Sequence, residues 1–417
     1  METEKQLIPH LFRTEYSKLV AVLGRLFGFE HIETAEDIVS DTFMLAAESW
    51  GQKGLPANPV AWLYTVAKNK AKDHLKRNTI FNEKVAVAIQ QDAEDGDETD
   101  IDLSGKNIAD SQLQMMFAIC NPVIPAEAQI GLSLRILCGF GIEEIADAFL
   151  SNKETINKRL FRAKEKLRDE RVKIELPAAA ELNNRHDTVL TTLYLLFNEG
   201  YYSQSQNISL RKDLCLEAMR LTYLLTENEV TAQPSVYVLL ALMCFHASRF
   251  EARTGQQGES ILYGEQDTSL WDKELIARGQ QYLNRASTGT KLTKYHIEAG
   301  IAFWHTQQAD SQTKWDGILQ LYNTLLMLEY SPIAALNRTY ALSKATDKQT
   351  AIVEAEKLQL VDNHLYHCLL GYLYTTINEG LALQHFDKAL KLAKAKADKT
   401  QIRLYIKQLN ERTLQTN

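Results

Sequence analysis

Residues 142–168 constrain the fold more strongly than any other segment of the chain. Their sequence, IEEIADAFLSNKETINKRLFRAKEKLR, holds two apolar-periodic runs joined by the connection Leu150 to Asn152. Spacings of three and four predict two helices whose inward residues are Ile145, Ala146, Phe149, Ile156, Leu160, Ala163 and Leu167. Ser151 or Asn152 is expected to cap the second helix. Because a small residue such as Ala146 lets two helices cross closely, the segment predicts a helix-turn-helix.

The outer face of the second predicted helix carries the chemistry of a DNA-reading surface. Its residues are Lys153, Thr155, Asn157, Lys158, Arg159, Phe161 and Arg162. Asn157 and Lys158 are suited to base edges, whereas Thr155, Arg159 and Arg162 are suited to phosphates. The alternative is a helical hairpin with a solvated basic face.

The charge distribution favours nucleic acid more than the net charge does. The chain carries a net charge of −7, which by itself argues against a nucleic-acid partner. However, residues 158–173 hold eight basic and three acidic side chains, and residues 68–77 hold five basic side chains against Asp73. Residues 91–102 contain seven acids and no base. This pattern predicts two basic helical surfaces joined by an acidic linker, or, alternatively, solvated helix faces joined by a silent spacer.

Three motifs resemble those of bacterial sigma factors. ETINKRLFRAKEKLR (154–168) resembles the recognition helix of region four, and AEDIVSDTFMLAAESW (35–50) resembles the region-two helix that docks on the clamp coiled coil of RNA polymerase. NPVAWLYTVAKNKAKDHLKR (58–77) resembles the adjoining helix, which opens and reads the minus-ten element. Their order, with a short linker, resembles the extracytoplasmic-function (ECF) group. LYLLFNEGYY (193–202) and SPIAALNR (331–338) resemble the subgroup that carries a long C-terminal helical extension.

The resemblance implies an all-α fold with two small helical sigma domains, an acidic linker and a helical-repeat extension. The expected division is region two at 1–80, the linker at 81–111, region four at 112–173, a helical extension domain at 174–290 and a tetratricopeptide-like repeat at 291–417. Gly371, Tyr374, Ala382, Phe386 and Ala389 lie close to the small and large positions of a tetratricopeptide hairpin. Abundant helix formers and only 8 prolines agree with a helical chain.

The resemblance also implies partners and site residues. Polymerase-binding residues are expected at Asp37, Ile38, Asp41, Phe43 and Glu48, with the acids facing a basic partner helix and the two apolar side chains adding contact. Minus-ten DNA is expected to contact Asn69, Lys72, Asp73, Lys76 and Arg77, and minus-thirty-five DNA the helix from Lys153 to Arg162. The expected partners are the clamp coiled coil and flap of core polymerase, promoter DNA, and a protein or peptide ligand of the extension.

We expect a cytoplasmic binding protein rather than an enzyme. No phosphate-binding Gly-rich loop, nucleophile elbow or metal-ligand spacing is present, so no cofactor or metal is expected. No run is long enough to span a membrane, and the N-terminal residues lack a signal pattern. One alternative is a helix-turn-helix regulator with a peptide-sensing helical-repeat receptor domain. A helical enzyme built on residues 180–310 is the other.

Several polar residues of the extension remain outside these roles. His246, Arg249 and Arg253 share a predicted helix face, Asp267, Trp271 and Asp272 lie close in sequence, and His296 and His305 flank an apolar segment. Because their spacing matches no metal-binding motif, the histidines are interpreted as structural.

Overall fold

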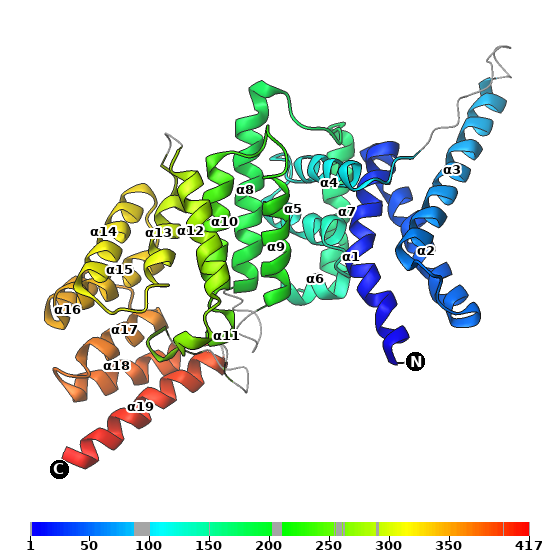
Figure 1. Ribbon diagram of the computed structural model, residues 1–417. Coiled ribbons are helices and arrows are strands. Elements are labelled where there is room, and N and C mark those ends of the chain that lie inside the picture. The colour runs from blue at the N-terminus through cyan, green and yellow to red at the C-terminus, as the bar shows by residue number, and fades with distance from the viewer. Residues whose placement is uncertain are drawn as a thin grey trace. The chain divides into compact units, whose positions relative to one another are not determined.

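The computed structural model is helical, and no strand occurs among the residues it describes. These residues are 2–86, 101–149, 151–201, 211–253, 255, 261, 263–288, 292–394 and 396–416. The all-α prediction is therefore confirmed. Contacts divide the chain into two compact units, Met1–Leu193 and Tyr194–Asn417 (Figure 1).

The first unit is built around one long N-terminal helix. Its elements are α1 (Glu2–Phe27), the 3-10 turn η1 (Phe29–His31), α2 (Ile32–Lys53), α3 (Pro59–Ala86), α4 (Gly105–Ile119), α5 (Ala126–Leu132), the π-helix η2 (Ser133–Leu137), α6 (Ile142–Ala148) and α7 (Lys153–Asp169). The helix α8 (Ala179–Tyr201) contains the point where the chain divides. Helix α1 packs on α2, α3, α4 and η2, so it organises the unit.

A glycine lets α1 approach its neighbours closely. A Cβ on Gly24 would lie 2.7 Å from Ile32 Cδ1 of α2 and 2.7 Å from Met115 Cε of α4. Leu19 and Tyr16, about one and two turns earlier, are fully buried. The core of this unit therefore depends on a small residue at one point of α1 and large ones before it.

The cap of α7 forms as the sequence predicts, whereas Leu150 of the predicted connection lies outside the described residues. Asn152 caps α7, with its Oδ1 accepting a hydrogen bond of 2.8 Å from Thr155 N. The predicted inward residues Ile145, Ala146, Ile156, Leu160, Ala163 and Leu167 are buried, and Phe149 is partly buried. Because the cap fixes where α7 begins, it also fixes which side chains face outward.

The predicted linker is shorter than its sequence pattern suggests. Helix α3 continues to Ala86 and α4 begins at Gly105, inside the linker expected at 81–111. Most of the acidic segment 91–102 falls in residues 87–100, outside the described residues. Ser104 caps α4 through a 3.3 Å hydrogen bond from Asn107 N to its Oγ, which explains the early start of that helix.

The second unit is a succession of helices in which neighbours in sequence pack together. Its elements are α9 (Lys212–Leu224), α10 (Pro234–Ala247), α11 (Phe250–Arg253), η3 (Tyr263–Glu265), η4 (Thr268–Leu270), α12 (Lys273–Ala286), α13 (Lys294–Trp304), α14 (Gln312–Leu328), α15 (Pro332–Ala345), α16 (Lys348–Lys357), α17 (His364–Tyr374), α18 (Glu379–Leu392) and α19 (Lys396–Thr416). From α13 to α19 each helix contacts the next, as in stacked helical hairpins.

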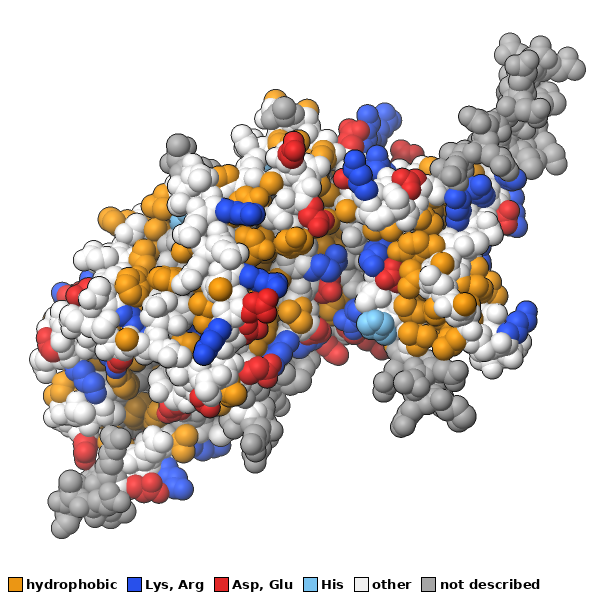
Figure 2. Space-filling model, in the orientation of Figure 1, with side chains coloured by type: hydrophobic (Ala, Val, Ile, Leu, Met, Phe, Trp, Pro, Cys, Tyr) orange, Lys and Arg blue, Asp and Glu red, His pale blue; other side chains and the backbone are white. Residues whose placement is uncertain are grey.

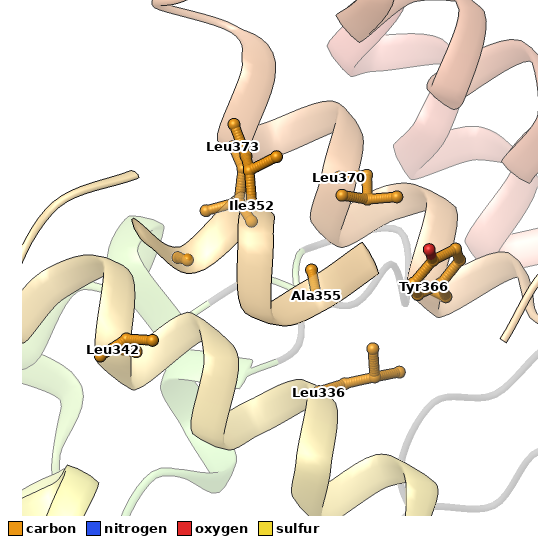
Figure 3. Packing of buried hydrophobic residues seen from close by; sticks show 8 residues of the cluster. Leu336, Leu342, Ile352, Ala355, Tyr366, Leu370 and Leu373 are labelled. Atoms are coloured by element: carbon orange, nitrogen blue, oxygen red, sulfur yellow. The ribbon is translucent and has the colours of Figure 1, made fainter. Parts of the chain in front are cut away.

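The packing of these hairpins places glycine against aromatic rings. A Cβ on Gly371 of α17 would lie 2.7 Å from the ring of Phe386 of α18. Earlier in the unit, a Cβ on Gly279 of α12 would lie 2.6 Å from the ring of Phe245 of α10. Nearby, Leu336 and Leu342 of α15 meet Ile352 and Ala355 of α16 and Tyr366, Leu370 and Leu373 of α17 in one cluster (Figure 3). Gly371 and Phe386, which the sequence places at small and large positions of a predicted hairpin, thus lie against each other.

Candidate nucleic-acid and polymerase interface

The outward face of α7 is exposed over about its first three turns. Lys153, Thr155, Asn157, Lys158, Phe161 and Arg162 are exposed, and Arg159 is partly buried. Phe161 has an exposed fraction of 57%, unusually high for a phenylalanine. Together the polar side chains offer amide, ammonium and guanidinium donors on one helix face, which suits contact with base edges and phosphates.

Ion pairs hold several of these cations in place. Lys158 Nζ lies 2.6 Å from Glu154 on the same helix, and Arg159 lies 3.3 Å from Glu127 of α5. Lys153 pairs with Glu143 of α6. Exposed pairs of this kind stabilise a fold little, so these cations can exchange their carboxylates for phosphates at low cost.

A groove of about 530 Å³ runs between α7 and the segment that enters α5. It is lined by Val123, Ile124, Pro125, Ala128, Thr155, Lys158, Arg159, Arg162, Ala163 and Lys166. Four of these are cationic, and all four come from α7. Lys166 is a residue that the sequence reasoning missed, although it follows Arg162 by one helical turn. The groove therefore concentrates positive charge beside the predicted DNA-reading face.

The second predicted DNA surface lies on α3. Asn69, Asp73, Lys76 and Arg77 are exposed and Lys72 is partly buried. Figure 2 shows Lys and Arg side chains gathered along this helix. Two aromatic side chains of α3 contact other residues: Tyr64 donates a 2.6 Å hydrogen bond to Glu15, and Trp62 meets Trp50 edge-on at 5.4 Å. Burial and Glu15 raise the pKa of Tyr64.

An exposed stripe on α2 combines carboxylates with apolar side chains. Asp37, Asp41, Met44, Leu45 and Glu48 are exposed on this helix, at spacings that keep them on one side. Met44 is 62% exposed and Leu45 is 39% exposed, and Figure 2 shows an apolar area over this part of the unit. Asp41 also pairs with Lys70 of α3 at 3.2 Å. We refer to these five residues as the α2 stripe.

Two predicted polymerase contacts lie in the core instead. Ile38 is 8% exposed and Phe43 is 5% exposed, so the expectation that their side chains meet a partner is wrong. Phe43 packs edge-on against Phe12 at 5.1 Å, within the aromatic contacts of α1. The large apolar side chains of α2 that are exposed are Met44 and Leu45. They follow Asp41 by three and four residues, so they lie on the same side of the helix as Asp41.

Glu36 of α2 has a structural role that the sequence does not predict. Glu36 is 6% exposed and forms ion pairs with Lys164 of α7 and with Arg135 of η2, the latter at 3.4 Å. Its nearest acidic neighbour, Asp37, is exposed. The acidic pattern of α2 therefore divides into a buried member and exposed ones.

Within the described ranges, no group of three or more His, Cys, Asp or Glu side chains is arranged to hold a metal ion. The described helices also contain none long and apolar enough to cross a membrane.

Comparison with known proteins assigns the class of the N-terminal part. Residues 11–80 match the sigma-70 region 2 family, and residues 185–287 match a family of unknown function, DUF6596. The chain is also 26% identical over 148 residues to an RNA polymerase sigma-H factor from Pseudomonas aeruginosa, covering 34% of this chain and 77% of that protein. These matches support an RNA polymerase sigma factor. No solved structure matches.

A second relative covers almost the whole chain. The uncharacterized protein R00370 from Rhizobium meliloti (strain 1021) is 32% identical over 386 residues, which is 91% of each chain. The protein therefore belongs to the same family as R00370. The extension after region 2 is part of that shared sequence, since the match extends far beyond residues 11–80.

Proposed function

We propose that the protein is an ECF-type sigma factor, a promoter-specificity subunit that joins RNA polymerase core to selected promoters. One observation carries this proposal. Within the segment matched to sigma-70 region 2, the exposed acidic and apolar α2 stripe lies next to the basic exposed face of α3. A surface for a basic partner helix and a surface for DNA on adjacent helices are what a subunit that bridges polymerase and promoter needs.

Core binding is assigned to the α2 stripe. Asp37, Asp41 and Glu48 supply negative charge for a basic coiled coil such as the polymerase clamp. Met44 and Leu45 supply the apolar centre that such contacts require. A second contact with the polymerase flap is assigned to the region-four helices.

The exposed face of α3 is assigned to the minus-ten element. Lys72, Lys76 and Arg77 attract the DNA backbone, and Asn69 and Asp73 offer amide and carboxylate groups to an unpaired base. The acidic linker that follows is proposed to thread the polymerase cleft.

The helix-turn-helix formed by α6 and α7 is assigned to the minus-thirty-five element. Its second helix is proposed to enter the major groove, with Asn157 and Lys158 at base edges and Thr155, Arg159 and Arg162 at phosphates. Lys153 and Phe161 lie on the same face, and Lys166 extends the phosphate contacts along the groove. Because both DNA modules are tethered to one polymerase, each needs only modest affinity.

The tetratricopeptide-like extension is proposed to regulate initiation by binding a protein or peptide. Stacked helical hairpins offer an extended surface for such a ligand. The protein is then a cytoplasmic binding factor without catalytic activity or cofactor.

Transcription with purified components tests the proposal. Full-length protein is mixed with bacterial core polymerase and a library of promoter fragments, and the initiated transcripts are sequenced. We expect the wild-type protein to initiate selectively. We expect Met44→Lys, which places a charge in the α2 stripe, to lose this initiation. Absence of core binding and of initiation from folded protein would instead favour the helix-turn-helix regulator with a receptor domain, which binds duplex DNA alone.

A shortened chain reports the effect of the extension, and the structure indicates where to cut. Arg185 donates to the Phe117 carbonyl, and Thr192 donates a 2.7 Å hydrogen bond to Gln129 of α5. Ending the chain after region four would remove both contacts. A chain ending at Tyr201, where α8 ends, retains them.

A further inference from the structure

A cluster of buried and half-buried cations and aromatic rings lies in the second unit, and it shares no residue with the proposed DNA and polymerase surfaces. It brings together Arg249 after α10, Tyr263 of η3, Trp271 after η4, His305 after α13 and Lys314 of α14. Arg249 is 6% exposed, Lys314 is 2% exposed and Trp271 is 5% exposed. We refer to these five residues as the cationic cluster. Burying two such cations is costly unless an anion compensates them.

The rings and cations contact one another directly. Lys314 Nζ donates a 2.8 Å hydrogen bond to the Tyr263 hydroxyl, and the Arg249 guanidinium lies 5.5 Å from the centre of the Tyr263 ring. Tyr263 also stacks on Trp271 with ring centres 6.2 Å apart and meets His305 edge-on at 4.7 Å. Tyr263 is therefore the centre of the cationic cluster, with Lys314 Nζ 5.2 Å and the Arg249 guanidinium 5.5 Å from the centre of its ring.

Several hydrogen-bonding atoms of the cluster are unused. Among the described residues, Arg249 Nε, Trp271 Nε1 and His305 Nδ1 are buried and have no hydrogen-bond partner. Among the described residues, Arg249 makes a long hydrogen bond of 3.4 Å to the hydroxyl of Tyr201. Buried polar atoms are nearly always paired in folded proteins. Unused donors next to unneutralised cations are the arrangement expected of a site whose ligand is an anion.

The acidic group that acts on the cluster, Asp310, is exposed and shared with other partners. The charge of Asp310 acts to raise the pKa of Lys314. However, Asp310 is exposed, and its carboxylate also accepts a hydrogen bond from Trp315 Nε1 and lies 3.8 Å from Lys344. No ion pair joins Arg249 to a carboxylate in the described part of the chain. Burial and the neighbouring charges of Arg249 and Lys314 lower the pKa of His305 to about 3, so this ring adds no positive charge at neutral pH. It can still donate a proton to a ligand oxygen through one nitrogen.

We propose that the cationic cluster is a binding site for a compact oxyanion, a phosphate or carboxylate group, held by Arg249, Lys314 and the Trp271 indole N–H. The guanidinium and ammonium groups supply the charge, and the rings of Tyr263 and Trp271 exclude water around it. This proposal does not depend on the sigma-factor role, because every residue in it belongs to the second unit.

Binding to the full-length protein tests the proposal. Inorganic phosphate and benzoate are titrated separately by calorimetry and by tryptophan fluorescence, with sodium chloride at matched ionic strength as reference. We expect saturable binding of one anion per chain, a quench that chloride does not reproduce, and a melting temperature that rises with ligand concentration. Binding of phosphate alone or benzoate alone identifies which oxyanion chemistry the site accepts. No saturable binding of either overturns the proposal.

Variants locate the site. Arg249→Met and Lys314→Met are expected to weaken binding at least tenfold, and Trp271→Phe, which keeps a ring and removes one donor, several-fold. Arg278→Met is the control, because Arg278 is an exposed cation of the same unit that pairs with Glu274 on α12. Circular dichroism checks the fold of each variant. Wild-type affinity in folded Lys314→Met and Trp271→Phe would overturn the proposal, even if Arg249→Met fails to fold.

Discussion

Glu36 of α2 and Lys164 of α7 form a buried ion pair, although 128 residues separate them in the sequence. The pair links the segment matched to sigma-70 region 2 with the helix that carries the proposed minus-thirty-five surface. Arg135 joins the same carboxylate, so one buried acid balances two cations from the second half of the unit. The two predicted DNA-binding modules are thus packed together in the structure.

We expect Glu36→Gln to lower the free energy of unfolding by about 3 kcal/mol, because it leaves two part-buried cations without their carboxylate. Chemical denaturation of the full-length protein measures the loss. Glu33→Gln is the matched control, because Glu33 of α2 also pairs with a cation of α7, Arg168, at 3.2 Å, but its side chain is 41% exposed. We expect Glu33→Gln to lower the free energy of unfolding by less than about 1 kcal/mol. Equal losses from both variants would contradict a special role for the buried pair.

The residues of α7 should divide into two functional groups. Arg162→Ala is expected to weaken initiation by about tenfold across all minus-thirty-five sequences, since phosphate contacts carry no sequence information. Asn157→Ala and Lys158→Ala should change which sequences are preferred. Transcription from a promoter library measures both effects, with Lys273→Ala on α12 as the control. A uniform loss from all three variants would contradict the assigned roles.

Replacing Met44 with lysine should weaken binding to core polymerase at least tenfold, because it places a charge in the apolar centre of the α2 stripe. Binding is measured with labelled protein and purified core enzyme. Met327→Lys is the control, since Met327 is 80% exposed on a helix of the second unit. If both variants bind core like the wild type, the α2 stripe is not the contact surface.

Gly371→Ala should destabilise the second unit by about 1–3 kcal/mol. The added methyl group would lie 2.7 Å from the buried Phe386 ring, and a packed core accommodates such an overlap only by shifting. Thermal and chemical unfolding measure the change, and adding Phe386→Leu should relieve part of it. Gly380→Ala in the same hairpin meets its nearest atom at 3.4 Å and should be neutral or stabilising by up to about 1 kcal/mol.

Glu298 should make the stability of the second unit depend on pH. Burial raises the pKa of Glu298 from 4.5 to about 7. Between pH 4.5 and pH 7, Glu298 is therefore protonated in the folded state and ionised in the unfolded state. Stability from this group is therefore complete below pH 4.5 and is lost as the pH rises toward 7. Denaturation at pH 5 and pH 8 should show Glu298→Gln gaining roughly 2–3 kcal/mol relative to the wild type at the higher pH. A pH-independent difference would contradict the shifted pKa.

Local patterns in the sequence were sufficient for much of the fold. The apolar spacing of α7 predicted its buried residues, and Asn152 predicted its cap, because both depend on contacts within a few residues. The sequence also placed Gly371 and Phe386 at small and large positions of a predicted hairpin, but their contact appears only in the structure. By contrast, the sequence did not predict the helical ends of the expected linker: α3 continues to Ala86 and α4 begins at Gly105, although these segments resemble a polar spacer.

The site was predicted less completely. The sequence placed Asn157, Arg162 and Asp73 on exposed faces correctly, yet it also assigned Ile38 and Phe43 to a partner surface. An apolar residue of a helix that packs in the core has the same sequence pattern as one that faces a partner. Phe43 is buried because it packs against Phe12 of α1. Glu36 and Asp37 are adjacent acids that the sequence cannot tell apart.

The sequence by itself determined the helical class, the caps and the sigma-like motifs, because each follows from neighbours along the chain. Only the tertiary structure decided that Glu36 pairs with Lys164 and that Met44 is exposed whereas Phe43 is buried. It also decided that Arg249 and Lys314 both contact Tyr263. These residues come from segments far apart in the sequence, and burial and charge pairing arise only when such segments pack against each other.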